Sequence, residues 1–135
     1  MWAKCCVFVG VAAIAALTRA PAAEVAATSS SAAFVASVFD ECTRVTDAEG
    51  YSVPNEMKER VRAHYTRLDS PHRPSILDDF EAGRRTEGEH TIGDFLRRAD
   101  RHGLAIPVLR AAHCNLQNYD ARLRKSSPEA SRSRS

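Results

Sequence analysis

The sequence predicts an all-α fold, a bundle of amphipathic helices in one domain. Apolar residues recur at three- and four-residue spacing along most of the chain, which is the period of one helix face. Glycines and prolines separate these segments, and no segment alternates between apolar and polar residues as a strand does. The chain has 135 residues, of which 44% are hydrophobic and 27% charged, so it is long enough and apolar enough to form one globular core.

The first 27 residues allow two interpretations. Lys4, the apolar run 5–17 and the small residues around 21–27 are typical of a secretory signal peptide, although the run is shorter than the roughly 20 residues of a transmembrane helix. The same pattern is typical of a buried helix in a cytoplasmic enzyme, because composition does not separate the two. On the first interpretation, cleavage of residues 1–27 would leave a small secreted helical binding protein.

Each of the next two segments carries apolar residues at helical spacing, which form a stripe along one face of a helix. A serine at position 30 or 31 can cap a helix over residues 30–48, and Gly50 is placed to end it. Its apolar face consists of Val35, Val38, Phe39, Cys42 and Val45. Pro54 suits the first turn of the following helix. The stripe of that helix consists of Met57, Val61, Tyr65 and Leu68.

The middle of the chain is predicted to form a loop and two helices. Two prolines make residues 70–74 a loop. A short helix is expected over residues 75–82, and Gly83 is its natural stop. Thr86 can cap the next helix, which Gly103 terminates.

The last predicted helix begins at Pro107 and keeps its apolar spacing as far as Leu123. The residues beyond Lys125 include no apolar side chain larger than alanine, so the tail 126–135 is predicted to be disordered. The helical domain is therefore expected to span residues 1–125.

Charge and cysteine pattern exclude several functions. A net charge of +2 gives no strong basic surface, so we expect neither nucleic acid nor a membrane as a partner. The four cysteines form no Cys-x-x-Cys pair, and the five histidines also lack metal-ligand spacing. We therefore expect no metal site, buried free thiols, and histidines at the surface or at helix ends.

Two stretches carry a more specific pattern. Residues 74–93 place Ser75 twelve residues before Glu87; the residues between them include Asp79, Gly83, Arg84 and Thr86. This run resembles the substrate-binding signature of ketopantoate reductases (2-dehydropantoate 2-reductases). The N-terminal segment, with Lys4, Gly10-Val11 and Thr18-Arg19-x-Pro21, resembles the helix that opens the C-terminal domain of one branch of that family.

The resemblance implies a helical domain like the C-terminal domain of ketopantoate reductases and of 6-phosphogluconate dehydrogenase-like proteins, and it implies three roles. Lys4 falls on the family's general acid, and Glu87 falls on the glutamate that contacts the substrate and orients the lysine. Ser75 falls on the serine that binds the substrate carboxylate. Each residue also has an ordinary alternative: a solvated lysine, a carboxylate at a helix start and an N-cap serine.

The sequence departs from the family at two positions on the lysine's helix face. Another branch of the family carries substrate-binding asparagines there, four and eight residues after the lysine. Here these positions are Phe8 and Ala12, whose side chains form no hydrogen bonds. This predicts either a substrate other than ketopantoate or a degraded site.

The resemblance covers residues 2–123 and none of the family's nucleotide-binding domain. No Gly-x-Gly-x-x-Gly follows a strand pattern, so the family's cofactor, NADPH, has no binding site in this chain. We expect the chain alone not to reduce 2-dehydropantoate to pantoate, the family's step in pantothenate biosynthesis. We expect a nucleotide-binding domain in trans, or self-association through the exposed interdomain face. A fragment without a selected function is a third interpretation.

Overall fold

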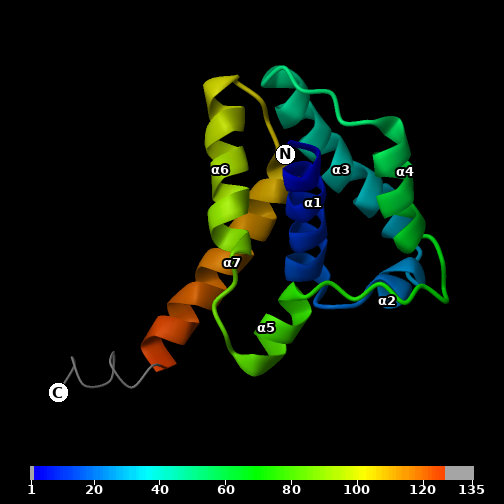
Figure 1. Cartoon of the computed structure of the whole chain (residues 1–135). Helices are drawn as coiled ribbons and strands as arrows, with labels where there is room; N and C mark the ends of the chain where they lie inside the picture. Colours follow the sequence, from blue (N-terminus) through cyan, green and yellow to red (C-terminus); the bar gives the residue numbers. More distant parts are fainter. Residues whose placement is uncertain (1, 127–135) are drawn as a thin grey trace.

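The computed structural model describes residues 2–126, which form seven α-helices and no strand (Figure 1). The all-α prediction is therefore confirmed. The helices are α1 (Trp2–Thr18), α2 (Ala22–Ala26), α3 (Ser31–Ala48), α4 (Asn55–His64), α5 (Ile76–Ala82), α6 (Gly88–Arg101) and α7 (Pro107–Ser126).

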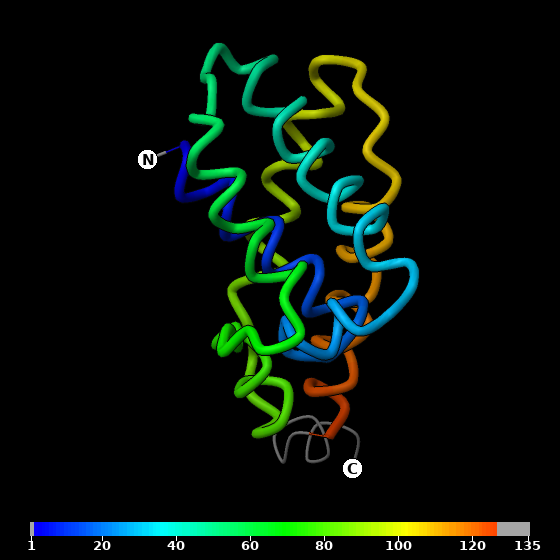
Figure 2. The backbone as a smooth tube through the Cα atoms, turned by 90° about the vertical axis from the view of Figure 1, so that its right-hand side faces the viewer, coloured from blue at the N-terminus to red at the C-terminus, as the bar shows by residue number. Residues whose placement is uncertain are grey.

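Helix α1 lies at the centre of the bundle and contacts α3, α6 and α7 most extensively (Figures 1 and 2). It is apolar on nearly all sides, and such a helix is stable only when its neighbours cover it. Its buried residues are mostly small: Cys6, Val9, Gly10, Ala12, Ala13, Ile14, Ala15 and Ala16. The N-terminal segment thus forms the core helix that the second interpretation of residues 1–27 requires.

Gly10 allows α1 and α3 to come close together. A Cβ atom at this position would overlap the aromatic ring of Phe39, with its Cζ atom only 2.8 Å away. Phe39 is itself 2% exposed, so its ring has little room to move aside. The absence of a side chain at Gly10 therefore sets the distance between the two helices.

Helix α3 also caps the start of α7. The first N–H groups of a helix lack partners within the helix. Here the carboxylate of Glu41, which is 5% exposed, accepts hydrogen bonds from the N–H groups of Val108 at 3.0 Å and Leu109 at 2.8 Å. The predicted start of α7 at Pro107 is confirmed, and its cap comes from a helix far earlier in the chain.

The predicted glycine stops are confirmed, because Gly50, Gly83 and Gly103 have φ angles of 88°, 68° and 66° after α3, α5 and α6. One other expectation about a helix end was wrong. Thr86 does not cap α6: the helix begins at Gly88, its N-cap residue is Glu87, and the Thr86 hydroxyl is buried without a partner among the described residues.

Two further details differ from the sequence prediction. Leu68 does not belong to the α4 stripe, because the helix ends at His64 and Leu68 is 73% exposed. Helix α2 was not anticipated. Its five residues begin after Pro21, which serves as the N-cap residue.

The four cysteines are all free, but only Cys6 and Cys42 are buried, whereas Cys5 is half-buried and Cys114 exposed. The expectation of buried thiols holds for two of them. Helix α7 extends to Ser126, and the predicted tail beyond it lies outside the described residues. Within residues 2–126, no helix is both long and apolar enough to cross a membrane, and no group of three potential ligands is placed to hold a metal ion.

Candidate functional site

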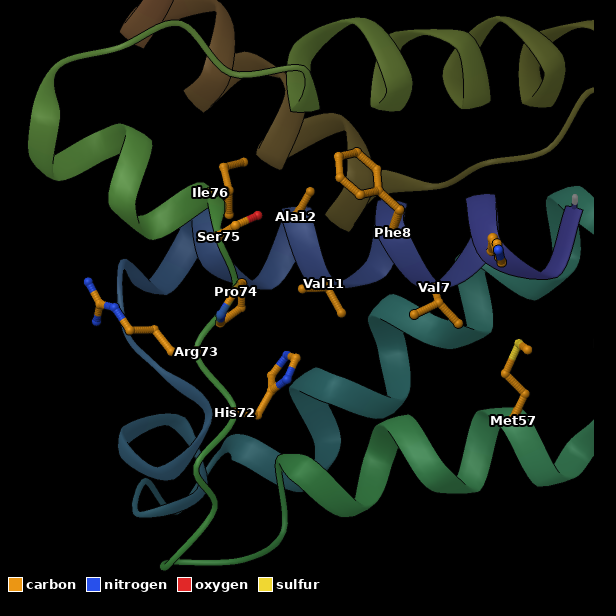
Figure 3. A pocket seen from close by; sticks show the side chains of 11 residues that line it. Val7, Phe8, Val11, Ala12, Met57, His72, Arg73, Pro74, Ser75 and Ile76 are labelled. Carbon is orange, nitrogen blue, oxygen red and sulfur yellow. The ribbon is translucent and has the colours of Figure 1, made fainter.

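Two cavities adjoin each other beside α1. The first has a volume of about 410 Å³ and lies between α1, α4 and the loop before α5 (Figure 3). The second has a volume of about 320 Å³ and lies between α1, α5 and the start of α6. Three residues, Phe8, Ser75 and Ile76, line both cavities. The two cavities are therefore adjacent, and these three residues form the wall that they share.

The structure brings together only part of the predicted site. Lys4 lines the first cavity, Glu87 lines the second, and Ser75 lines both. Phe8, which is 40% exposed, stands between the lysine and glutamate sides. Figure 3 shows Phe8 and Ala12 on the side of α1 that faces Ile76. The two positions that depart from the family pattern thus lie within the candidate site.

Lys4 and Ser75 have polar groups that nothing else in the described chain engages. Lys4 lies in the first turn of α1, is exposed, and makes no hydrogen bond or ion pair with residues 2–126. Ser75 immediately precedes α5, and its side chain makes no capping hydrogen bond. Ser75 therefore occupies the N-cap position of α5, as its alternative role requires, but its hydroxyl does not bond to the helix and is free to bind a ligand.

Glu87 occupies the N-cap position of α6, and its exposed side chain likewise makes no capping hydrogen bond. Its backbone carbonyl accepts hydrogen bonds from the N–H of Thr91 at 3.1 Å and from the hydroxyl of Thr91 at 3.1 Å. These bonds fix the backbone while the carboxylate stays unengaged. Asp79 and Arg85 line the same cavity.

The Thr18-Arg19-x-Pro21 motif ends α1 and forms the turn that follows it. Thr18 donates a hydrogen bond to the carbonyl of Ile14 at 2.8 Å and accepts one from the N–H of Ala20 at 3.3 Å. Arg19 follows in the left-handed conformation, with a φ of 55°. The motif therefore turns the chain sharply out of α1.

Arg19 joins this turn to α5 and α7. Its guanidinium carbon lies 3.6 Å from the centroid of the Phe80 ring, and one of its nitrogens donates a hydrogen bond to Asn115 at 2.8 Å. Tyr119 packs edge-on against Phe80 with ring centroids 5.0 Å apart. The Tyr119 hydroxyl also lies 3.1 Å from the carbonyl oxygen of Asp79. Helix α5, which lies between Ser75 and Glu87, is thereby fastened to α7.

Sequence reasoning missed these supporting residues. Phe80, Tyr119 and Asn115 carry no sequence pattern that marks them as support for the site. The contacts run between residues 96 and 40 positions apart in the chain for Arg19–Asn115 and Tyr119–Asp79. The strongest local signal was Arg19 within its motif, because a charged residue between Thr18 and Pro21 has no evident role in a helix stop.

His72, one member of a stacked histidine pair, lines the first cavity. The rings of His64 and His72 stack with centroids 4.5 Å apart, and Tyr65 meets His72 edge-on at 5.8 Å. Burial lowers the pKa of His72, and the neighbouring His64 lowers it further. The Nε2 atom of His72 and the hydroxyl of Tyr65 are buried without a hydrogen-bond partner in the described chain. The surface position expected for His72 was wrong, because it is half-buried and lines the cavity.

Comparison with known proteins places this chain in a family. The family described as ketopantoate reductase PanE/ApbA, C terminal, matches residues 1–120. The chain is 30% identical over 121 residues to the uncharacterized oxidoreductase YkpB of Bacillus subtilis. It is 40% identical over 70 residues to the 2-dehydropantoate 2-reductase of Halobacterium salinarum.

The fold comparison agrees. The structure matches the PanE/ApbA family ketopantoate reductase of Ralstonia eutropha with a TM-score of 0.79 and 25% identity, over 92% of this chain and 41% of that one. The match with YkpB covers 90% of this chain and 40% of that protein. The match with the Halobacterium reductase covers 52% of this chain and 23% of that protein. The chain thus spans about two fifths or less of these relatives. It belongs to the ketopantoate reductase family, as a C-terminal helical domain.

Proposed function

We propose that this chain forms the substrate-side half of an NADPH-dependent reductase that converts a 2-oxo acid of the 2-dehydropantoate type to the 2-hydroxy acid. The observation that carries the proposal is that Lys4, whose ammonium is unpaired in the described chain, and Ser75, whose hydroxyl is unengaged, line the same cavity. Family membership and the name of the Halobacterium relative support the reaction type. If the substrate is 2-dehydropantoate itself, the product is the pantoate of pantothenate biosynthesis.

The three site residues suit this chemistry. Reduction of a ketone places negative charge on the carbonyl oxygen, and a positioned ammonium group both stabilises that charge and donates the proton. Lys4 takes this role, and Ser75 donates a hydrogen bond to the substrate carboxylate. Glu87 lines the adjacent cavity, and we assign it the role of orienting the ammonium group once the substrate and the nucleotide-binding domain complete the site. The reduced nicotinamide supplies the hydride.

Residues 2–126 offer no fit for the nucleotide. A dinucleotide-binding motif needs a glycine-rich turn between a strand and a helix, and the described residues form no strand. We therefore propose that a separate nucleotide-binding domain supplies the cofactor side of the active site. It would dock over the exposed Lys4, Ser75 and Glu87. A pyridine-nucleotide reductase of this kind would act in the cytoplasm. Self-association over the same face is the competing arrangement.

The experiment adds a purified dinucleotide-binding domain of a ketopantoate reductase to the chain and follows NADPH oxidation with 2-dehydropantoate and related 2-oxo acids. We expect no turnover by the chain alone and turnover by the pair. Replacement of Lys4 by alanine should lower turnover about 100- to 10,000-fold, the range typical of general acids. Glu87→Ala should also lower it, whereas Lys125→Ala, a lysine outside the site, should not.

Two results would contradict the proposal. One is a domain pair that forms, as judged by sedimentation, but turns over none of the acids. The other is unchanged turnover in Lys4→Ala. Restored turnover that depends on Lys4 and Glu87 would exclude the interpretation of the chain as a fragment without function.

A further inference from the structure

The first cavity combines one free cation with walls that are almost entirely apolar. Lys4 and Arg73 are the charged residues that line it, and no carboxylate does. Arg73 is neutralised by ion pairs with Asp78 at 3.3 Å and Glu81 at 2.7 Å. Lys4 has no such partner in the described chain. The cavity therefore favours a ligand with a negative charge near Lys4.

Away from Lys4 and Ser75, the cavity offers a ligand little to bond with. Figure 3 shows that side chains from α1 and α4 form its walls; they are Val7, Phe8, Val11, Ala12 and Met57. The imidazole of His72 also borders the cavity, but its Nε2 atom is closed off from solvent. A hydroxyl group on the ligand's side chain would thus lose its bonds to water and gain none from Phe8 or Ala12.

A ligand of matching chemistry is an anion with an apolar side chain. The volume of about 410 Å³ lies within the range of small-molecule sites, so it leaves room for a branched or aromatic group beyond the carboxylate. Ser75 and Lys4 line the cavity with a hydroxyl and an ammonium group, which suit the carboxylate and the carbonyl of such a ligand. Met57 adds an adaptable thioether to the wall that α4 forms.

We infer that the substrate is a 2-oxo acid with an apolar side chain that carries no hydroxyl group, in place of the hydroxylated 2-dehydropantoate. This inference rests on the proposed function, since it assigns the substrate class of the same site. Phe8 and Ala12 set the preference, because the part of the wall that they form presents hydrocarbon and no hydrogen-bonding side chain.

The test compares two acids that differ in one group. 2-Dehydropantoate carries a terminal hydroxyl, and 3,3-dimethyl-2-oxopentanoate carries a methyl group in its place. Each acid is titrated into the full chain while NMR chemical shifts are followed, because this method detects weak binding and does not depend on catalysis. We expect the methyl analogue to bind about tenfold more tightly, as an unpaired hydroxyl in an apolar site implies.

Variants at the two departing positions sharpen the test. Phe8→Asn adds an amide at a position that is 40% exposed, so the fold should tolerate it. It should shift the preference toward 2-dehydropantoate, and Ala12→Asn should do the same if the variant folds. Leu68→Asn replaces an exposed apolar residue that lines neither cavity, and it should leave the preference unchanged.

The outcomes separate the two proposals. Equal or tighter binding of 2-dehydropantoate to the unmodified chain would overturn the substrate inference and leave the proposed function standing. If neither acid shifts the signals around Lys4 and Ser75, the substrate inference is overturned, and the turnover assay with the added nucleotide-binding domain decides the proposed function separately. Tighter binding of the methyl analogue that weakens in Lys4→Ala and Ser75→Ala supports both.

Discussion

The guanidinium group of Arg19 stacks on the ring of Phe80, with its central carbon 3.6 Å from the ring centroid. The same side chain donates hydrogen bonds to the carbonyl of Ala16 at 3.2 Å and to Asn115 at 2.8 Å. One residue at the end of α1 therefore holds α5 and α7 together, and with them the segment between Ser75 and Glu87.

We expect Arg19→Lys to lower the free energy of unfolding by about 1–2 kcal/mol, because lysine keeps the charge but loses the planar stack and the forked hydrogen bonds. Urea unfolding measures the change. A double-mutant cycle with Phe80→Leu should give a coupling energy of about 0.5–1 kcal/mol. Arg60→Lys on the exposed side of α4 is the control, and a coupling near zero would contradict the stacking role.

Gly10→Ala should destabilise the protein by about 1–3 kcal/mol. Alanine is the better helix former, but its Cβ would overlap the buried ring of Phe39. Thermal unfolding measures the loss. Phe39→Leu frees space at the contact, so Gly10→Ala should cost less in that background than in the wild-type chain. A similar cost in both backgrounds would show that Phe39 is not the cause.

Loss of the Glu41 cap should weaken α7 from its first turn. Glu41→Ala leaves two backbone N–H groups buried without an acceptor, so we expect a loss of at least about 2 kcal/mol. Glu41→Gln keeps one acceptor oxygen, so its loss of stability should be smaller than that of Glu41→Ala. Asp40→Ala, at the exposed neighbouring position, is the matched control. Hydrogen exchange at Val108 and Leu109 should rise only in the Glu41 variants.

Stability should fall on mild acidification because of His72. Burial holds its pKa below the usual value of 6.5, so the unfolded chain takes up a proton at a higher pH than the folded one. The stabilisation is present above about pH 6.5 and is lost as the pH falls through the folded pKa. His72→Phe keeps a ring against His64 and removes the titration. Urea unfolding between pH 7 and pH 5 should show a shallower decline in this variant, and parallel curves would contradict the prediction.

The helix stops were predictable from sequence because they depend on local backbone geometry. Gly50, Gly83 and Gly103 end their helices in conformations that other residues avoid, so residue type alone indicates the end. The cap on α7 was not predictable. Glu41 lies 67 positions before Val108, and nothing near either residue in the sequence links the two.

The candidate site was predictable in its membership but not in its arrangement. Lys4, Ser75 and Glu87 followed from a family resemblance, and the structure brings Lys4 and Ser75 to one cavity. Glu87 lines a different cavity from Lys4, with Phe8 in the wall that the two cavities share. This arrangement depends on how α1 packs against α5 and α6, and a residue pattern does not reveal that packing. Thr86 failed as a cap for the same reason, because the turn between those helices places Glu87 at the N-cap position.

The central position of α1 has a consequence for synthesis of the protein. The helices that cover it, from α3 to α7, all follow it in the chain. On the ribosome, this apolar segment is therefore made before any of its partners exist. It stays incompletely covered until α7 has emerged, so this domain is exposed to aggregation during synthesis until its last helix has been made.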